Sequence, residues 1–77
     1  MNKQRRKLIN ELIGKAYDLS CEIEEVLNEE QESFDNMPEN LQYSERGESM
    51  QEAISSLEEA QSSIDDCKSY LESLIEY

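Results

Sequence analysis

The sequence predicts an all-α fold, an antiparallel hairpin of two long, coiled-coil-like helices. Apolar residues recur at alternating gaps of three and four in both halves of the chain, and a segment with the single proline separates these halves. We expect one domain over residues 1–77, with a helix over about 3–33, a turn over about 34–44 and a helix over about 45–76. Each helix would turn one apolar stripe toward the other.

The first helix carries a regular apolar stripe. Its members are three or four residues apart, which is the spacing of a heptad seam. The expected seam consists of Ile9, Leu12, Ala16, Leu19, Ile23 and Val26. Gly14 and Cys21 fall outside this seam, on the expected outer face, where a glycine costs about 1 kcal/mol of helix propensity relative to alanine.

The second helix contains an internal heptad repeat. One expected seam position holds the large residues Met50, Leu57, Ile64 and Leu71. The other holds mostly small residues, Ala53, Ala60, Cys67 and Leu74. Small side chains let two backbones approach closely, so we expect tight packing here. Because Cys67 would lie in the seam and Cys21 on an outer face, the two cysteines should not meet in an antiparallel hairpin.

The segment between the helices predicts an ordered turn. Pro38 cannot continue a helix, and it forces Met37 out of helical geometry. Pro38 can begin a short helical turn that reaches Leu41. Ser44 is then a suitable N-cap for the second helix, with Glu45 well placed against the helix dipole.

The apolar residues that flank the two seams exceed what a single hairpin can cover. A core this small supplies roughly 3–5 kcal/mol, so a protein of this size commonly needs a disulfide, a metal or another subunit. The predicted protein interface is Leu8, Ile13, Tyr17, Leu27, Ile54, Tyr70 and Ile75. Covering this strip with a second copy would give a four-helix bundle, a homodimer or larger homo-oligomer. A different protein could cover it instead, and an ordinary widened core is the alternative.

The chain has a net charge of −12, distributed unevenly. Residues 1–15 contain five basic residues and Glu11, a net charge of +4, whereas residues 16–77 contain eighteen acidic and two basic residues, a net charge of −16. Such a chain repels nucleic acid, and its expected partner is a protein with a basic surface. The acidic surface would include Glu24, Glu25, Glu29, Glu58, Glu59, Asp65 and Asp66. The basic start could face the acidic end of its own second helix or that of another subunit.

Composition argues against an enzyme. The chain has no histidine, so it has no imidazole base and no histidine metal ligand, and two cysteines cannot fill a zinc site. We therefore expect no catalytic residues, no cofactor and no metal. No stretch approaches the roughly 20 apolar residues of a membrane span, and Asn10, Glu11 and Lys15 interrupt the run that a signal peptide needs. We expect a soluble cytoplasmic protein without direct membrane contact.

The turn segment resembles a recurring signature of small acidic proteins encoded by phages and mobile elements of Gram-positive bacteria. The residues that carry the resemblance are Asp35-Asn36-Met37-Pro38-Glu39-Asn40-Leu41-Gln42 and Ser44-Glu45-Arg46-Gly47-Glu48. Those proteins also begin with a basic segment and end in acidic, serine-containing heptads. The resemblance implies a setting in the cytoplasm of a bacterial host, and it carries over no functional residues.

Three functions are compatible with these observations. The first is a non-enzymatic protein-binding module of a phage or mobile element that modulates or inhibits a host or defence protein. The second is an acidic nucleic-acid mimic that blocks a DNA- or RNA-binding protein. The third is a structural, oligomerising component, in which the acidic surface serves only solubility.

Overall fold

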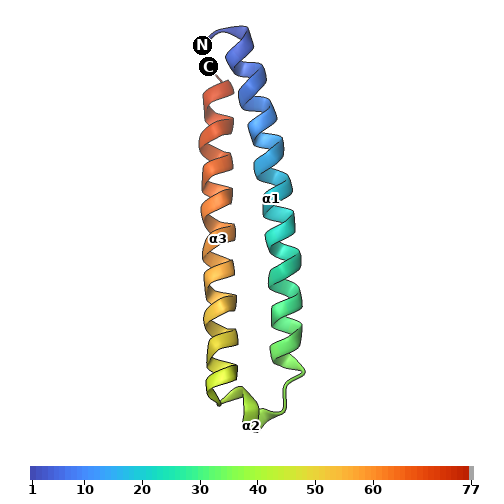
Figure 1. Ribbon diagram of the computed structural model, residues 1–77. Helices are drawn as coiled ribbons and strands as arrows, with labels where there is room; N and C mark the ends of the chain where they lie inside the picture. The colour runs from blue at the N-terminus through green and yellow to red at the C-terminus, as the bar shows by residue number, and fades with distance from the viewer. Residues whose placement is uncertain (77) are drawn as a thin grey trace.

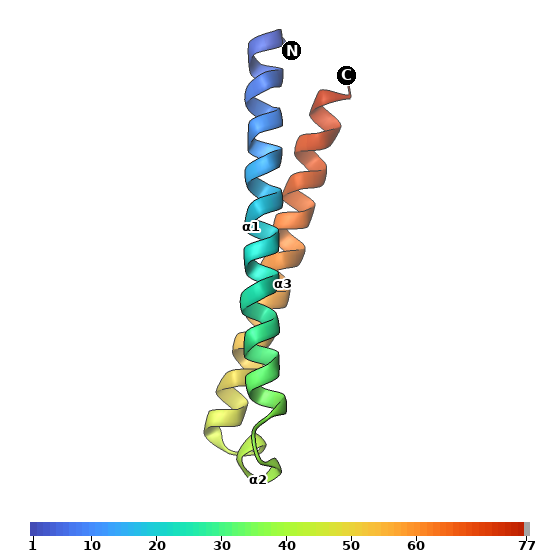
Figure 2. The same ribbon diagram turned by 90° about the vertical axis from the view of Figure 1, so that its right-hand side faces the viewer.

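The computed structural model describes residues 1–76 and confirms the predicted all-α hairpin. Within these residues the elements are α1 (Lys3–Asp35), α2 (Glu39–Gln42) and α3 (Glu45–Ile75). The two long helices run antiparallel and side by side (Figure 1), and they are inclined to one another in the perpendicular view (Figure 2). The molecule is a rod of 58 × 14 × 13 Å. The first helix extends two residues further than expected, to Asp35. Both termini lie at the same end of the rod (Figure 1).

Both long helices begin at a polar N-cap. The side chain of Asn2 accepts a hydrogen bond from the backbone N–H of Arg5 at 2.8 Å. Ser44 caps α3 by accepting from the backbone N–H of Gly47 at 3.4 Å, and Glu45 follows in the first turn, as the sequence predicted. These caps satisfy backbone donors that have no partner inside a helix.

The connection between the long helices is held by a short helix and one amide side chain. Pro38 is the N-cap of α2 rather than its first helical residue, with φ −55° and ψ 143°. The side-chain amide of Gln42 donates to the carbonyl oxygens of Phe34 at 3.1 Å and Met37 at 3.2 Å. Gln42 therefore joins α2 to the end of α1, where helical carbonyls would otherwise lack donors.

Gly47 marks the close approach of α2 to the first turn of α3. Gly47 is buried. The atom nearest to a Cβ added there would be the carbonyl oxygen of Gln42. The added Cβ would also lie 2.5 Å from the carbonyl carbon of Gln42 and 2.7 Å from the carbonyl oxygen of Leu41. Any larger residue must displace the backbone of α2. By contrast, a Cβ atom added at Gly14 would meet nothing within 4 Å.

The packed seam of α1 differs from the predicted one. Apart from Cys21, the less exposed residues of this helix are Arg6, Ile9, Ile13, Ala16, Ser20, Ile23, Leu27, Glu30 and Phe34. This set keeps alternating gaps of four and three, but it shares only part of the predicted stripe. Leu12, Leu19 and Val26, which we expected in the seam, are 46%, 45% and 49% exposed. Their assignment to the seam was wrong.

The seam of α3 is likewise displaced. Its less exposed residues are Gly47, Met50, Ile54, Leu57, Gln61, Ile64, Lys68, Leu71 and Ile75. The large seam position was therefore predicted correctly. The small position was not, since Ala53, Ala60, Cys67 and Leu74 are exposed. Compared with the prediction, each long helix is rotated about its own axis, so that one of its two predicted seam positions faces solvent instead of the other helix.

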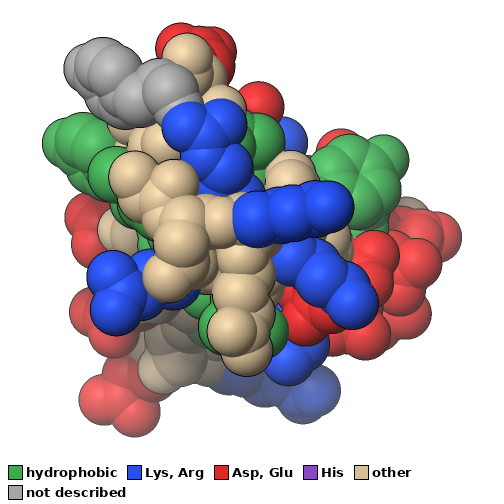
Figure 3. Space-filling model, turned by 90° about the horizontal axis from the view of Figure 1, so that it is seen from above, with side chains coloured by type: hydrophobic (Ala, Val, Ile, Leu, Met, Phe, Trp, Pro, Cys, Tyr) green, Lys and Arg blue, Asp and Glu red, His purple; other side chains and the backbone are tan. Residues whose placement is uncertain are grey.

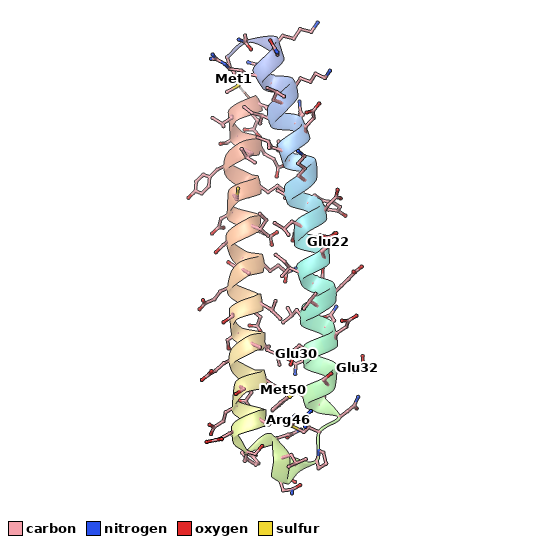
Figure 4. The ribbon with its side chains drawn as sticks, in the orientation of Figure 1. Met1, Glu22, Glu30, Glu32, Arg46 and Met50 are labelled. Atoms are coloured by element: carbon pink, nitrogen blue, oxygen red, sulfur yellow. The ribbon has the colours of Figure 1, made fainter. Side chains whose placement is uncertain are left out.

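Polar residues interrupt the packed seam, and few side chains are fully covered. Among the described hydrophobic residues, the buried ones are Ala16 and Ile54, which are 6% and 7% exposed. Glu30 of α1 and Met50 of α3 lie in the space between the long helices, whereas Glu32 points away from it (Figure 4). The hairpin is thus one layer of two helices without a deeply buried core.

Candidate protein-binding face

Displacement of both seams leaves apolar residues of α1 and α3 exposed along one side of the hairpin. We define the apolar face as Leu8, Leu12, Leu19 and Val26 of α1 with Ala53, Ala60, Cys67 and Leu74 of α3. Within each helix most neighbouring members are seven residues apart, so they lie along one stripe. The two stripes meet over the seam, because Leu12, Leu19 and Cys67 line the same groove.

The groove between the stripes is shallow and apolar. It encloses about 350 Å³ and is lined by Leu12, Lys15, Ala16, Leu19, Ile64, Cys67 and Leu71. A neighbouring hollow continues it along α3 and is lined by Ser63, Asp66, Cys67, Tyr70, Leu71 and Leu74. Cys67 and Leu71 belong to both, so the apolar face is continuous toward the C-terminal end of α3. A face of this kind, rimmed by charged residues, is suited to contact with another protein.

The structure separates the predicted interface residues into two groups. Leu8, Tyr17 and Tyr70 are exposed. The other four were expected to remain outside the seam, but they are half-buried or buried at seam positions. These residues are Ile13, Leu27, Ile54 and Ile75. The large apolar side chains that the structure leaves exposed include Leu12, Leu19 and Val26, which had been predicted as seam residues and not as interface residues.

Two polar contacts close the opposite side of the seam. The hydroxyl of Ser20 donates to a carboxylate oxygen of Asp65 at 3.0 Å. The ammonium group of Lys68 lies 5.4 Å from the ring centroid of Tyr17, within the range of a cation–π contact. Both contacts join α1 to α3 in one antiparallel register. By helical spacing, Tyr17 lies across the seam from the apolar face, and Ser20 is the seam position next to it.

Tyr17 has a perturbed phenol. A side-chain hydrogen bond with Cys21, one helical turn away, is the main cause that raises the pKa of Tyr17. The negative charge that Cys21 acquires on ionisation raises this pKa further. A phenol is neutral at physiological pH even at its ordinary pKa, so Tyr17 offers its ring to Lys68 rather than a negative charge.

The acidic surface is exposed but unevenly distributed along the rod. Glu24, Glu25, Glu29, Glu58, Glu59, Asp65 and Asp66 are all exposed. Residues 22–59, which we call the turn half, contain thirteen acidic residues and Arg46, a net charge of −12. The terminal half, residues 1–21 and 60–77, contains six acidic and six basic residues and has no net charge. Lys and Arg side chains gather at the end of the rod that carries the termini, with acidic side chains around them (Figure 3).

The positions of the two cysteines differ from those predicted. Cys21 is half-buried rather than on an outer face, and Cys67 is exposed rather than in the seam. Both are free thiols, as expected for residues that do not meet. Within residues 1–76, the structure brings together no group of three or more side chains suited to hold a metal ion. No helix in the same range is long and apolar enough to cross a membrane.

In comparisons with protein families, with curated proteins and with solved structures, no match to this chain was found.

Proposed function

We propose that the protein is a non-enzymatic protein-binding module that pairs through its apolar face into a four-helix bundle. The observation that carries this proposal is the exposure of Leu12, Leu19 and Val26 beside a groove that both long helices line. A hairpin with this face covered has the two-layer packing that ordinary helical bundles use.

Hydrophobic burial supplies a driving force for the pairing. A leucine or valine side chain gains about 1.5–3 kcal/mol when it is fully removed from water. Since Leu12, Leu19 and Val26 are close to half exposed, covering them contributes about 1 kcal/mol each. In a symmetric pair each contribution occurs twice, because both copies present the same face.

The acidic turn half is the surface that the paired rod offers to a different protein. A net charge of −12 over residues 22–59 attracts a basic surface and accelerates its association. The bound protein in this proposal belongs to a bacterial host and is modulated or inhibited on binding. That setting rests on the resemblance of residues 35–48 to small acidic phage proteins.

Unfolding measurements test the pairing. The midpoint of thermal unfolding should rise with protein concentration, because association stabilises the folded chain by mass action. Leu19→Glu places a charge in the apolar face and should abolish this dependence. Asn28→Glu is the matched control, since it adds the same charge to α1 at an exposed site away from that face. A midpoint that does not vary with concentration in the wild-type protein would contradict pairing.

The thirteen acidic residues of the turn half favour a nucleic-acid mimic as the second candidate. In that case the hairpin would occupy the basic groove of a DNA- or RNA-binding protein. Binding would weaken steeply with salt, compete with DNA and survive Leu19→Glu. Binding that is insensitive to salt, or unaffected by competing DNA, would exclude mimicry.

A further inference from the structure

We propose that the second copy packs antiparallel to the first, on a two-fold axis that crosses α1 at Leu19. This inference rests on the proposed pairing and specifies its geometry. Two face-to-face hairpins can align their terminal ends or oppose them. When the ends are opposed, α1 lies on α1 of the other copy and α3 lies on α3; when they are aligned, α1 lies on α3.

The apolar stripe of α1 is self-complementary in the antiparallel arrangement. Leu12 and Val26 are each seven residues from Leu19. A two-fold axis at Leu19 therefore places Leu19 against its own copy and each Leu12 against Val26 of the other chain. Every exposed leucine or valine in this part of the stripe then meets an apolar partner.

The stripe of α3 has nearly the same centre of symmetry. The α3 stripe is symmetric around the midpoint between Ala60 and Cys67. An antiparallel second copy would therefore place Ala60 against Cys67 and Ala53 against Leu74. The hydrogen bond from Ser20 to Asp65 sets Leu19 almost level with that centre. At 1.5 Å per residue, the centres of the two stripes differ by only about 4 Å along the rod. One two-fold axis can therefore serve both helices.

Charged residues beside the groove match the same axis. Lys15 lines the groove, and Glu22 lies one heptad further along α1. In the antiparallel pair, Lys15 of each copy faces Glu22 of the other. An exposed ion pair of this kind contributes about 0–1 kcal/mol, so it favours an orientation more than it adds stability.

The charge of the two halves disfavours the parallel arrangement. Aligned ends would place two turn halves side by side, each with a net charge of −12. Opposed ends place each turn half beside a terminal half that has no net charge. Like charges in contact are unfavourable, and this repulsion is avoided when the ends are opposed.

Single-cysteine proteins test this geometry by disulfide cross-linking. In a background with Cys21→Ser and Cys67→Ser, Leu19→Cys should link readily to its own copy under mild oxidation. Leu12→Cys alone and Val26→Cys alone should link at least tenfold less, because each new thiol lies about 21 Å along the rod from its own copy. An equal mixture of these two proteins, refolded together, should link as a heterodimer that mass spectrometry identifies.

The outcomes separate this inference from the pairing on which it rests. The Leu19→Cys protein is also mixed with a second protein that carries Cys21→Ser and keeps native Cys67. If Leu19→Cys links to Cys67 of that second protein and not to its own copy, the copies are parallel and the inference is overturned. A two-chain particle that links in none of these combinations overturns it as well, while the pairing stands. If the wild-type protein and the cysteine-free background protein both have the mass of one chain in solution, both the antiparallel geometry and the pairing are contradicted. Circular dichroism confirms that each variant is helical before oxidation.

Discussion

Replacement of Gly47 by alanine should destabilise the hairpin, although alanine is the better helix former. In the helix interior, alanine is favoured over glycine by about 1 kcal/mol. At Gly47, however, the added Cβ meets backbone atoms of Leu41 and Gln42 at 2.7 Å or less. Backbone cannot move aside as a flexible side chain can. Forcing it apart costs about 3 kcal/mol, the upper end of typical overpacking. The expected net loss is about 2 kcal/mol.

Gly14→Ala is the matched control for this prediction. A Cβ atom at Gly14 meets nothing within 4 Å, so the variant should gain about 1 kcal/mol from helix propensity alone. The two alanine variants should thus differ by about 3 kcal/mol. For a domain of this size, each kcal/mol shifts the melting temperature by about 4–8 °C, so their midpoints should differ by more than about 10 °C.

The assay is thermal and urea unfolding followed by helical circular dichroism at one fixed protein concentration. Fixing the concentration matters because association would otherwise contribute to the midpoint. If Gly47→Ala unfolds at or above the wild-type temperature, α2 does not pack against the first turn of α3 as described.

Three further changes test other contacts. Ser44→Ala removes the N-cap of α3 and should cost about 1 kcal/mol in urea unfolding, whereas Ser49→Ala, at an exposed site in the same helix, should not destabilise the protein; equal effects would argue against the cap. Gln61→Leu should stabilise the hairpin by about 1 kcal/mol, since position 61 is half-buried in the seam; a loss of stability would contradict that placement. Cys21→Ala should lower the pKa of Tyr17, so that the phenol ionises at lower pH than in the wild-type protein. Phenolate absorbance, in a background whose other three tyrosines are phenylalanine, measures this shift, and an unchanged titration would exclude the Cys21 contact.

The turn was predictable because its rules are local. Pro38 excludes a continuous helix through neighbouring residues, and Ser44 followed by Glu45 is a helix start in many contexts. These residues determine where the first long helix ends and the second begins, almost independently of how the two helices pack. The contribution of Gly47 was not predictable, since its requirement for a small residue arises from the approach of α2 in three dimensions.

The rotation of the long helices could not be read from apolar spacing. Ile9, Ala16 and Ile23 belong equally to a stripe that includes Leu12 and to one that includes Ile13. Both stripes keep gaps of three and four, so periodicity alone does not choose between them. The structure selects the stripe that includes polar seam positions such as Ser20, a choice that a count of apolar residues disfavours. The unselected stripe then becomes the apolar face.

The solution mass of the wild-type protein tests the central claim, that the apolar face is covered by a second copy. Light scattering over a concentration series, at low and high salt, measures this mass directly. Pairing predicts twice the 9.0 kDa of one chain, and it predicts that high salt preserves the pair because burial of apolar surface drives it. A constant mass of one chain at all concentrations would contradict the claim and leave the apolar face open to a different protein.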